Sequence, residues 1–299
     1  MANWASDKAI EAKAACLITI RRIRGVAGSA EEYCIGTTEI VPFLAPQRVK
    51  YAWTQERDLK LSRPDGDAAA ALHEMGCVLL QPQELARECD VQLVDLASLA
   101  RTWNQLPRDA YLRDGGRYRS RRHSCFVYEH GAPQLVAHRA HWQPTEYNAL
   151  HGGMERWFEP ITPEVLTAPV WNRLLAGLSA LFSKTRPVER WYIEAHQFRI
   201  DTATGIGRPT PEGAHRDGVD YVAVILVNRH NVRGGETRVF EAEGTSGVRF
   251  TMTAPWTALL LDDAKVIHET TPIQNDGEGG VRDTLVLTFR EQGFQAPPA

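Results

Sequence analysis

Residues 191–200 read WYIEAHQFRI, and residues 221–227 read YVAVILV. Both runs are short and rich in β-branched or aromatic residues, which is typical of strands. Similar short runs follow, separated by glycine and aspartate turns, at residues 237–240, 248–253, 258–261, 266–268 and 284–289. Many short strands separated by such turns predict an antiparallel sandwich or small barrel in the C-terminal part of the chain.

Helical patterns precede these strands. Apolar residues recur every three or four positions from Trp171 to Phe182 and again over residues 93–103. Asp67 can cap a shorter helix over residues 68–75, which Gly76 would end. The sequence therefore predicts an α+β fold in which N-terminal helices buttress a β core. We expect a single domain over residues 66–299, with residues 1–65 as an extension packed on it.

Composition excludes several classes of protein. The chain has 299 residues, 43% of them hydrophobic and 24% charged, with a net charge of −3. Without a basic excess, nucleic acid is not the expected partner, and no apolar run is long enough to span a membrane. Five cysteines without CxxC spacing and an N-terminus without a signal-peptide layout predict free thiols in a soluble, cytoplasmic protein. The oligomeric state is left open.

A candidate metal site begins in residues 211–218, which read PEGAHRDG. If this segment is extended, His215 and Asp217 leave the same face of the chain. His268 follows 53 residues after His215, at the end of a strand-like run, so it can return to the same pocket. Two histidines and a carboxylate form the facial triad of non-haem Fe(II) oxygenases. Six other histidines have no partner at ligand spacing and are interpreted as structural or surface residues: His73, His123, His130, His138, His141 and His151.

Arg282 and Thr284 form a second pair with a spacing of two on a predicted strand. A guanidinium fork beside a hydroxyl is suited to binding a carboxylate. A metal triad followed by such a clamp indicates a chelating acid with a distal carboxylate, and 2-oxoglutarate fits that description. The alternative for Arg282 is a surface salt bridge with Asp283.

Several motifs in the same order resemble the 2-oxoglutarate/Fe(II) dioxygenase family that includes bacterial isoleucine hydroxylases and fungal aziridine-forming amino-acid oxygenases. They are EAHQFRI at residues 194–200, residues 209–218, Asn228-Arg229 with Gly234-Gly235-Glu236, residues 266–273, Arg282-Asp283, and, upstream, YLRDGGRYR at 111–119 and YNALHGG at 147–153. The resemblance covers roughly residues 65–292.

The resemblance implies a double-stranded β-helix (jelly-roll, cupin-like) core, with Fe(II) as the metal and 2-oxoglutarate and O2 as co-substrates. Carried over by position, His215, Asp217 and His268 match the metal ligands and Arg282 matches the 2-oxoglutarate anchor. Thr284 is added on its spacing alone. Members act on small free amino acids, by C–H hydroxylation or by oxidative cyclisation such as aziridine formation. Related iron halogenases carry a small residue where this chain has Asp217, so halogenation is not expected.

The substrate pocket is harder to predict. An amino acid needs donors for its carboxylate and an acceptor for its ammonium group. We expect pocket residues among Arg117, Tyr118, Tyr147, Asn148, Gln197 and Asp220, with Leu287 and Phe289 lining the apolar end on the same face as Arg282 and Thr284. An ordinary structural role is the alternative for each.

Two other functions use the same residues. A zinc hydrolase could employ His215, Asp217 and His268 with a bound water, but it leaves Arg282 and Thr284 without a role. A non-catalytic jelly-roll binding protein could retain the site without turnover.

Overall fold

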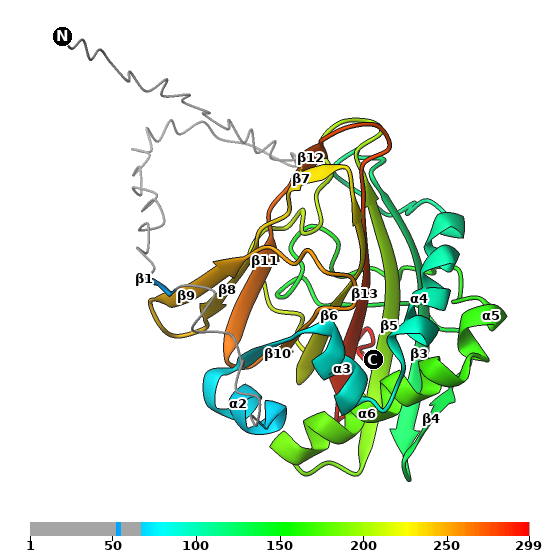
Figure 1. Cartoon of the computed structure of the whole chain (residues 1–299), viewed down its shortest axis with the longest axis vertical. Helices are drawn as coiled ribbons and strands as arrows, with labels where there is room; N and C mark the ends of the chain where they lie inside the picture. The colour runs from blue at the N-terminus through cyan, green and yellow to red at the C-terminus, as the bar shows by residue number, and fades with distance from the viewer. Residues whose placement is uncertain (1–51, 55–66, 299) are drawn as a thin grey trace, which may run out of the picture. The chain divides into compact units, whose positions relative to one another are not determined.

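The computed structural model describes residues 52–54 and 67–298, in which two larger β-sheets and one two-stranded sheet are accompanied by a layer of helices (Figure 1). The larger sheet has the order β2 (Cys77–Leu80), β10 (Ala258–Asp262), β6 (Tyr221–His230), β13 (Val281–Arg290), β5 (Arg190–Asp201), β3 (Arg119–Glu129) and β4 (Ala132–Leu135). The smaller sheet has the order β1 (Ala52–Thr54), β9 (Ser246–Phe250), β8 (Thr237–Glu241) and β11 (Val266–Thr270), and β12 (Ile273–Asn275) pairs with β7 (Val232–Gly234). The predicted jelly-roll core is confirmed.

The helices form the layer that was expected to buttress the strands, but β2, β3 and β4 lie between them along the chain instead of following them. They are α2 (Ala68–Met75), α3 (Pro82–Glu88), α4 (Leu93–Leu99), the 3-10 helix η1 (Ala100–Gln105), α5 (Pro163–Leu166) and α6 (Pro169–Thr185). The Asp67 side chain accepts the backbone N–H of Ala69 at 2.9 Å, and Gly76 ends α2 with a left-handed φ of 73°. The apolar stripe of α6 is buried, and each of its large side chains contributes about 1.5–3 kcal/mol by leaving water.

Side-chain alternation divides the large sheet into two faces. Odd-numbered residues of β5 and β13, such as Ile193 and Leu287, belong to the apolar core shared with α6. A separate apolar core forms between the two sheets and includes Val222, Val239 and Val248. Even-numbered residues of β5 and β13 therefore face the interior between the sheets, where the candidate site lies.

Of the predicted extension, residues 1–65, only β1 lies within the described residues, where it pairs in parallel with β9. The rest of that prediction falls outside them. Cys77, Cys89 and Cys125 are buried free thiols, while Cys16 and Cys34 lie outside the described residues. None of the helices in the described residues is both long and apolar enough to cross a membrane.

Candidate active site

His215 and His268 are brought together by backbone pairing. His215 lies in the segment between β5 and β6, and His268 lies in the middle of β11. An isolated antiparallel bridge joins them, with N–H···O distances of 3.1 and 3.0 Å. Their ring centroids are 4.7 Å apart. The 53-residue separation in sequence is thus closed by direct backbone hydrogen bonds.

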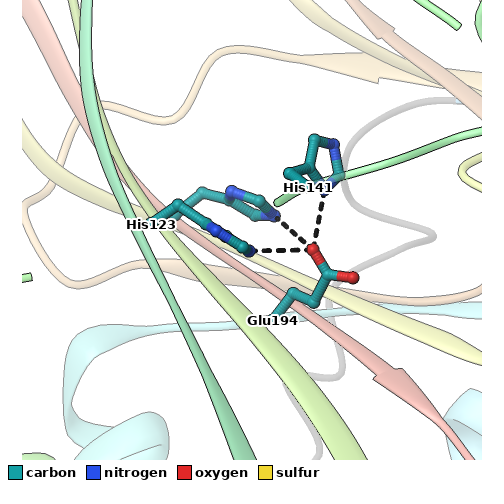
Figure 2. Close-up of side chains that lie close together, drawn as sticks. His123, His141 and Glu194 are labelled. Atoms are coloured by element: carbon teal, nitrogen blue, oxygen red, sulfur yellow. Dashed lines mark hydrogen bonds and ion pairs between the residues drawn. The ribbon is translucent and has the colours of Figure 1, made fainter. Parts of the chain in front are cut away.

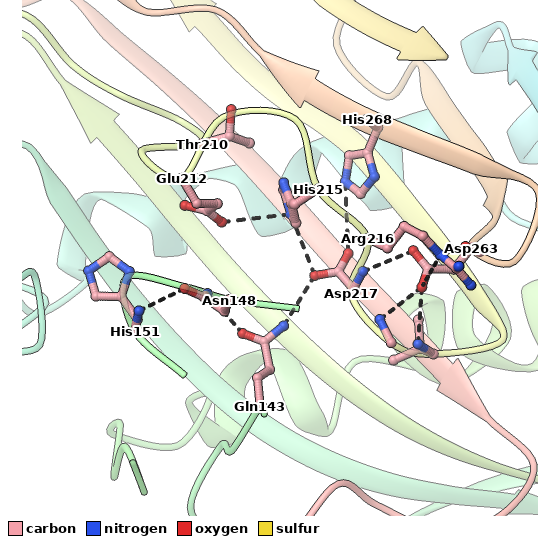
Figure 3. Close-up of polar contacts among 12 residues, drawn as sticks. Gln143, Asn148, His151, Thr210, Glu212, His215, Arg216, Asp217, Asp263 and His268 are labelled. Carbon is pink, nitrogen blue, oxygen red and sulfur yellow. Dashed lines mark hydrogen bonds and ion pairs between the residues drawn. The ribbon is translucent and has the colours of Figure 1, made fainter. Parts of the chain in front are cut away.

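Asp217 completes a triad with these two histidines (Figure 3). Its Oδ1 lies 3.7 Å from His215 Nε2, and its Oδ2 lies 3.8 Å from His268 Nε2. These separations exceed hydrogen-bond distances. They are shorter than the ~4.2 Å that two ligand atoms can span around one ion with bonds of about 2.1 Å. The donor set therefore fits a single first-row metal ion.

The segment that carries Asp217 is held by a buried carboxylate. Asp263, which follows β10, accepts the backbone N–H groups of Asp217, Gly218 and Val219 at 3.0, 2.8 and 3.1 Å (Figure 3). Gly218 has a φ of 73°, and a Cβ there would lie 2.4 Å from the Tyr147 ring. The path of the chain at this turn consequently requires glycine.

Hydrogen bonds also orient the triad side chains. His215 Nδ1 is 2.9 Å from the carbonyl oxygen of Gly213, which favours a proton on Nδ1 and makes Nε2, on the side of Asp217, the nitrogen that a metal ion would take. Gln143 Nε2 donates to Asp217 Oδ1 at 3.3 Å. Outer contacts of this kind fix the tautomer and rotamer of ligating residues.

The triad carries strongly perturbed pKa values. Burial opposes the charge on His215, but the nearby carboxylates of Asp217 and Glu212 raise its pKa to about 10. Burial and the neighbouring His215 lower the pKa of His268 to about 4. Burial alone would raise the pKa of Asp217, but His215 holds it at about 2. Such clusters of shifted groups are typical of functional sites.

Arg282 and Thr284 lie on β13 and line the same cavity as the triad. Arg282 is buried, and its Nη2 has no hydrogen-bond partner among the described residues. Burial, followed by the charge of Arg229, lowers its pKa to about 10, so the guanidinium stays protonated near neutral pH. The predicted alternative, a salt bridge with Asp283, is wrong, because Asp283 lies on the other face of the strand and pairs with Arg199 at 2.7 Å. A buried guanidinium whose Nη2 lacks a partner among the described residues fits the distal carboxylate of 2-oxoglutarate.

A second polar cluster in the cavity surrounds Glu194 on β5 (Figure 2). Glu194 Oε2 is 2.9 Å from His123 Nε2 and 2.7 Å from His141 Nδ1. His196 Nδ1 lies 2.7 Å from Nη2 of Arg121. His123 and His141, which were interpreted as structural or surface residues, are buried and share Glu194 as a partner. β3 and β5 pair with His123 opposite His196, and this register could not be read from the spacing of the histidines.

The structure places few of the predicted pocket residues in the cavity. Asn148 lines it and donates to Gln143 Oε1 at 3.1 Å. Tyr147 packs behind Gly218 instead of facing the cavity. Arg117 is exposed, and Tyr118 belongs to a small apolar cluster outside the cavity.

Four further predicted pocket residues also lie outside the cavity. Asp220 pairs with Arg186 at 2.6 Å. Gln197 donates to Thr102 Oγ1 at 3.1 Å, on the helix side of β5. Leu287 and Phe289 belong to the helix-side core, and Phe289 contacts the ring of Phe182 at 4.7 Å between centroids. Their placement on the face of Arg282 was wrong because odd and even residues of a strand alternate.

The cavity wall that replaces them comes largely from β3, β5 and the chain between β4 and α5. It includes Arg121, His141, Gln143, Arg156, Glu194 and His196. The signal that could have found part of it is the alternation of Glu194, His196 and Phe198 on β5, with Gln197 and Arg199 on the other face. Arg121, Gln143 and Arg156 carry no such local signal.

Comparisons with known proteins agree with this site. A family model described as 2OG-Fe dioxygenase matches residues 100–288. The chain belongs to the 2-oxoglutarate/Fe(II) dioxygenase family and is an oxidoreductase whose cofactor and co-substrates are Fe(II), 2-oxoglutarate and O2. The matched region contains the triad, Arg282 and Glu194. No protein with a curated description matches the chain.

Solved structures extend the comparison. A BsmA homologue from Methylobium petroleophilum is 55% identical, with a TM-score of 0.74 over 77% of this chain and 94% of that one. IDO from Bacillus thuringiensis is 19% identical, with a TM-score of 0.62 over 75% and 94% of the two chains. The Fe(II)/α-ketoglutarate-dependent dioxygenase TqaL is 16% identical, with a TM-score of 0.57 over 75% and 85%. The last two show the shared fold.

Proposed function

We propose that the chain oxidises a small free amino acid, with an aliphatic side chain favoured, by C–H hydroxylation or by oxidative ring closure. The observation that carries this proposal is one cavity that contains the His215–Asp217–His268 triad, the buried guanidinium of Arg282 and a wall of both acidic and basic side chains. The resemblance to amino-acid oxygenases supports the choice of substrate. The buried free cysteines support a cytoplasmic location.

In this proposal His215 Nε2, Asp217 and His268 Nε2 hold Fe(II), and Arg282 with Thr284 binds the distal carboxylate of 2-oxoglutarate. When bound, Fe(II) would supply an oxidant able to attack a C–H bond, made from O2 with 2-oxoglutarate as the reductant that is lost as succinate and CO2. The surrounding residues orient the three proposed metal ligands. Asp263 fixes the backbone of the Asp217 segment, and Gln143 orients the Asp217 carboxylate. The carbonyl oxygen of Gly213 accepts a hydrogen bond from Nδ1–H of His215.

Apolar side chains on the same wall keep water away from the reacting groups. Val224 and Val286 line the cavity from β6 and β13, and Val219 lines it from the segment beside Asp217. Exclusion of water strengthens the electrostatic interaction of Arg282 with a bound carboxylate. The family membership favours this activity over a zinc hydrolase or a non-catalytic binding protein, and Arg282 has no role in a hydrolase.

The test is a panel of free amino acids incubated with the protein, Fe(II), ascorbate and 2-oxoglutarate. Succinate release stimulated by an amino acid is expected, together with a product that has gained one oxygen or lost two hydrogens by mass spectrometry. A panel that never stimulates turnover contradicts the amino-acid substrate. Normal coupled turnover by His268→Ala contradicts the metal assignment.

A further inference from the structure

Glu194 is a buried carboxylate that lacks a cationic partner within the part of the chain that the structure describes. It is 6% exposed, and its hydrogen bonds within the described residues all end on Oε2, donated by His123 and His141. No arginine or lysine in the described residues lies within salt-bridge distance of it, although Arg121 and Arg156 line the same cavity. A buried charge without a counter-charge is costly, so such a group implies a ligand that completes it.

The histidines around Glu194 position it without neutralising it. Burial lowers the pKa of His141 to about 4 and lowers the pKa values of His123 and His196 as well, so these rings are neutral near pH 7. Burial alone would raise the pKa of Glu194, but the contacts with His141 and His123 hold it below its usual range. Glu194 is therefore an oriented anion with its Oε1 left without a hydrogen bond among the described residues (Figure 2).

A second metal ion is a poorer occupant of this cluster, although the four ligand atoms lie within 4.8 Å of one another. The 2.7 and 2.9 Å separations are those of N–H···O hydrogen bonds. His196 Nδ1 is engaged by Arg121, whose guanidinium is sandwiched between Phe158 and Phe198 at 3.8 and 4.4 Å from the ring centroids. A fixed guanidinium next to the cluster opposes a dication.

Glu194 lies at a suitable place for a small substrate of the metal centre. His141 contacts Glu194, and Gln143, two residues further along the same segment, contacts Asp217. An extended chain advances about 3.3 Å per residue, so roughly 7 Å separate the two contact points along the segment. That is on the scale of one small amino acid, with its ammonium group at Glu194 and its side chain toward the triad.

The charges of the cavity favour a substrate without net charge. Four arginines line it, Arg119, Arg121, Arg156 and Arg282, together with the carboxylates Glu194, Glu212 and Asp217. Asp109 adds a fourth carboxylate from behind, 2.7 Å from Arg119. The side-chain charges cancel, and Fe(II) cancels the dianion 2-oxoglutarate. A zwitterion adds no net charge, and its carboxylate can meet Arg156, whose buried Nε has no hydrogen-bond partner among the described residues.

We propose that Glu194, held by His123 and His141, binds the α-ammonium group of the substrate and so makes the enzyme selective for free amino acids over the corresponding carboxylic acids. The proposal rests on the proposed function and assigns a specificity-determining residue to it. No covalent step is involved.

The test is a two-by-two comparison of protein and ligand. Wild type and Glu194→Gln, loaded with Mn(II) and 2-oxoglutarate, are titrated by calorimetry with L-isoleucine and with 3-methylpentanoic acid, which has the same carbon skeleton without the amino group. We expect Glu194→Gln to weaken L-isoleucine binding about 100-fold and to leave 3-methylpentanoic acid binding unchanged. L-Valine and 3-methylbutanoic acid provide a second matched pair.

Glu129→Gln is the matched control, since it makes the same change on β3 at a carboxylate that pairs with Arg190. It should bind all four ligands as wild type does. If Glu194→Gln fails to fold, Glu194→Asp replaces it, because this variant withdraws the carboxylate by one methylene and keeps its charge. A loss confined to the amino acids supports the proposal in either variant.

Several outcomes would contradict the proposal that Glu194 binds the α-ammonium group. An equal loss for both members of a pair means that Glu194 is structural. Bound metal at two equivalents in wild type, falling to one in Glu194→Gln, makes the cluster a metal site. Amino-acid-stimulated succinate release that is as efficient in Glu194→Gln as in wild type overturns the role of Glu194 alone. A wild type that binds 2-oxoglutarate but no amino acid overturns the amino-acid function as well.

Discussion

The backbone N–H of Asp217 donates to Oδ1 of Asp263 at 3.0 Å, so a proposed metal ligand is positioned by a carboxylate 46 residues away. Asp263 also accepts from Gly218 and Val219 and is fully buried. The smaller sheet supplies His268, and the segment beside the larger sheet supplies Asp217. Asp263 thus acts together with the backbone bridge between His215 and His268 in placing the three residues of the triad.

Asp263→Asn should lower the affinity for Fe(II). An amide oxygen replaces the carboxylate, and the amide NH2 faces backbone N–H donors, so the Asp217 segment loses part of its support. We expect a loss of about 10- to 100-fold in metal affinity, measured by anaerobic Fe(II) or Mn(II) titration. Asp262→Asn, at the neighbouring and less buried carboxylate, is the control and should bind metal normally. Equal affinities in the two variants would refute the anchoring role.

Arg282→Gln should weaken 2-oxoglutarate binding by roughly 100-fold or more, because a buried guanidinium–carboxylate pair is lost. Thr284→Val removes only a hydroxyl and should cost about tenfold or less. Thr288→Val makes the same change on the same face of β13, further from Arg282, and should leave the dissociation constant for 2-oxoglutarate unchanged. The measurement is calorimetry with the Mn(II)-loaded protein. Unaltered binding by Arg282→Gln would contradict its assignment as the anchor.

Gly218→Ala should be more damaging than Gly115→Ala. Both glycines have a φ of 73°, so both substitutions carry the strain of a left-handed backbone, about 1–2 kcal/mol. A Cβ at Gly115 meets no atom within 4 Å, whereas a Cβ at Gly218 lies 2.4 Å from the Tyr147 ring. Thermal unfolding should show the larger loss for Gly218→Ala, accompanied by weaker metal binding. Similar losses in both variants would mean that Tyr147 simply moves aside.

The metal-free protein should lose stability as the pH falls below 6.5. Burial lowers the pKa of His141 from 6.5 to about 4. Above pH 6.5 the His141 ring is neutral in both the folded and the unfolded protein. Between pH 6.5 and pH 4 it takes up a proton only in the unfolded protein. The free energy of unfolding then falls by about 1.4 kcal/mol per pH unit for each such histidine. His123 and His196 are shifted in the same direction and steepen the decline.

Urea unfolding at pH 7 and pH 5 measures this effect, and His141→Asn should reduce the slope by one proton. His215 offsets a small part of this decline, because its raised pKa of about 10 makes its contribution complete well below pH 6.5 and already partly lost at pH 7. Stability that stays level or increases from pH 7 to pH 5 would show that the buried histidines are not neutral in the folded state.

Local sequence determined a large part of this protein. The apolar stripe of α6, the Asp67 cap and the spacing of His215 and Asp217 each depend on neighbours a few residues apart, and the structure shows each as expected. The placement of Arg282 and Thr284 on one wall followed from strand alternation. The prediction that Leu287 and Phe289 share the face of Arg282 was wrong, because strand alternation puts these odd-numbered residues on the opposite face, in the helix-side core.

Only the tertiary structure showed that His123, His141 and Glu194 form one cluster on the cavity wall. His123 and Glu194 are 71 residues apart in the sequence, and His141 and Glu194 are 53 residues apart. No local pattern indicates which strands of the large sheet are neighbours. The order and register of β3, β5 and β13 bring them into one cavity with the triad. The sequence specifies short-range periodicity directly, whereas strand pairing depends on the packing of the whole core, which no single segment encodes.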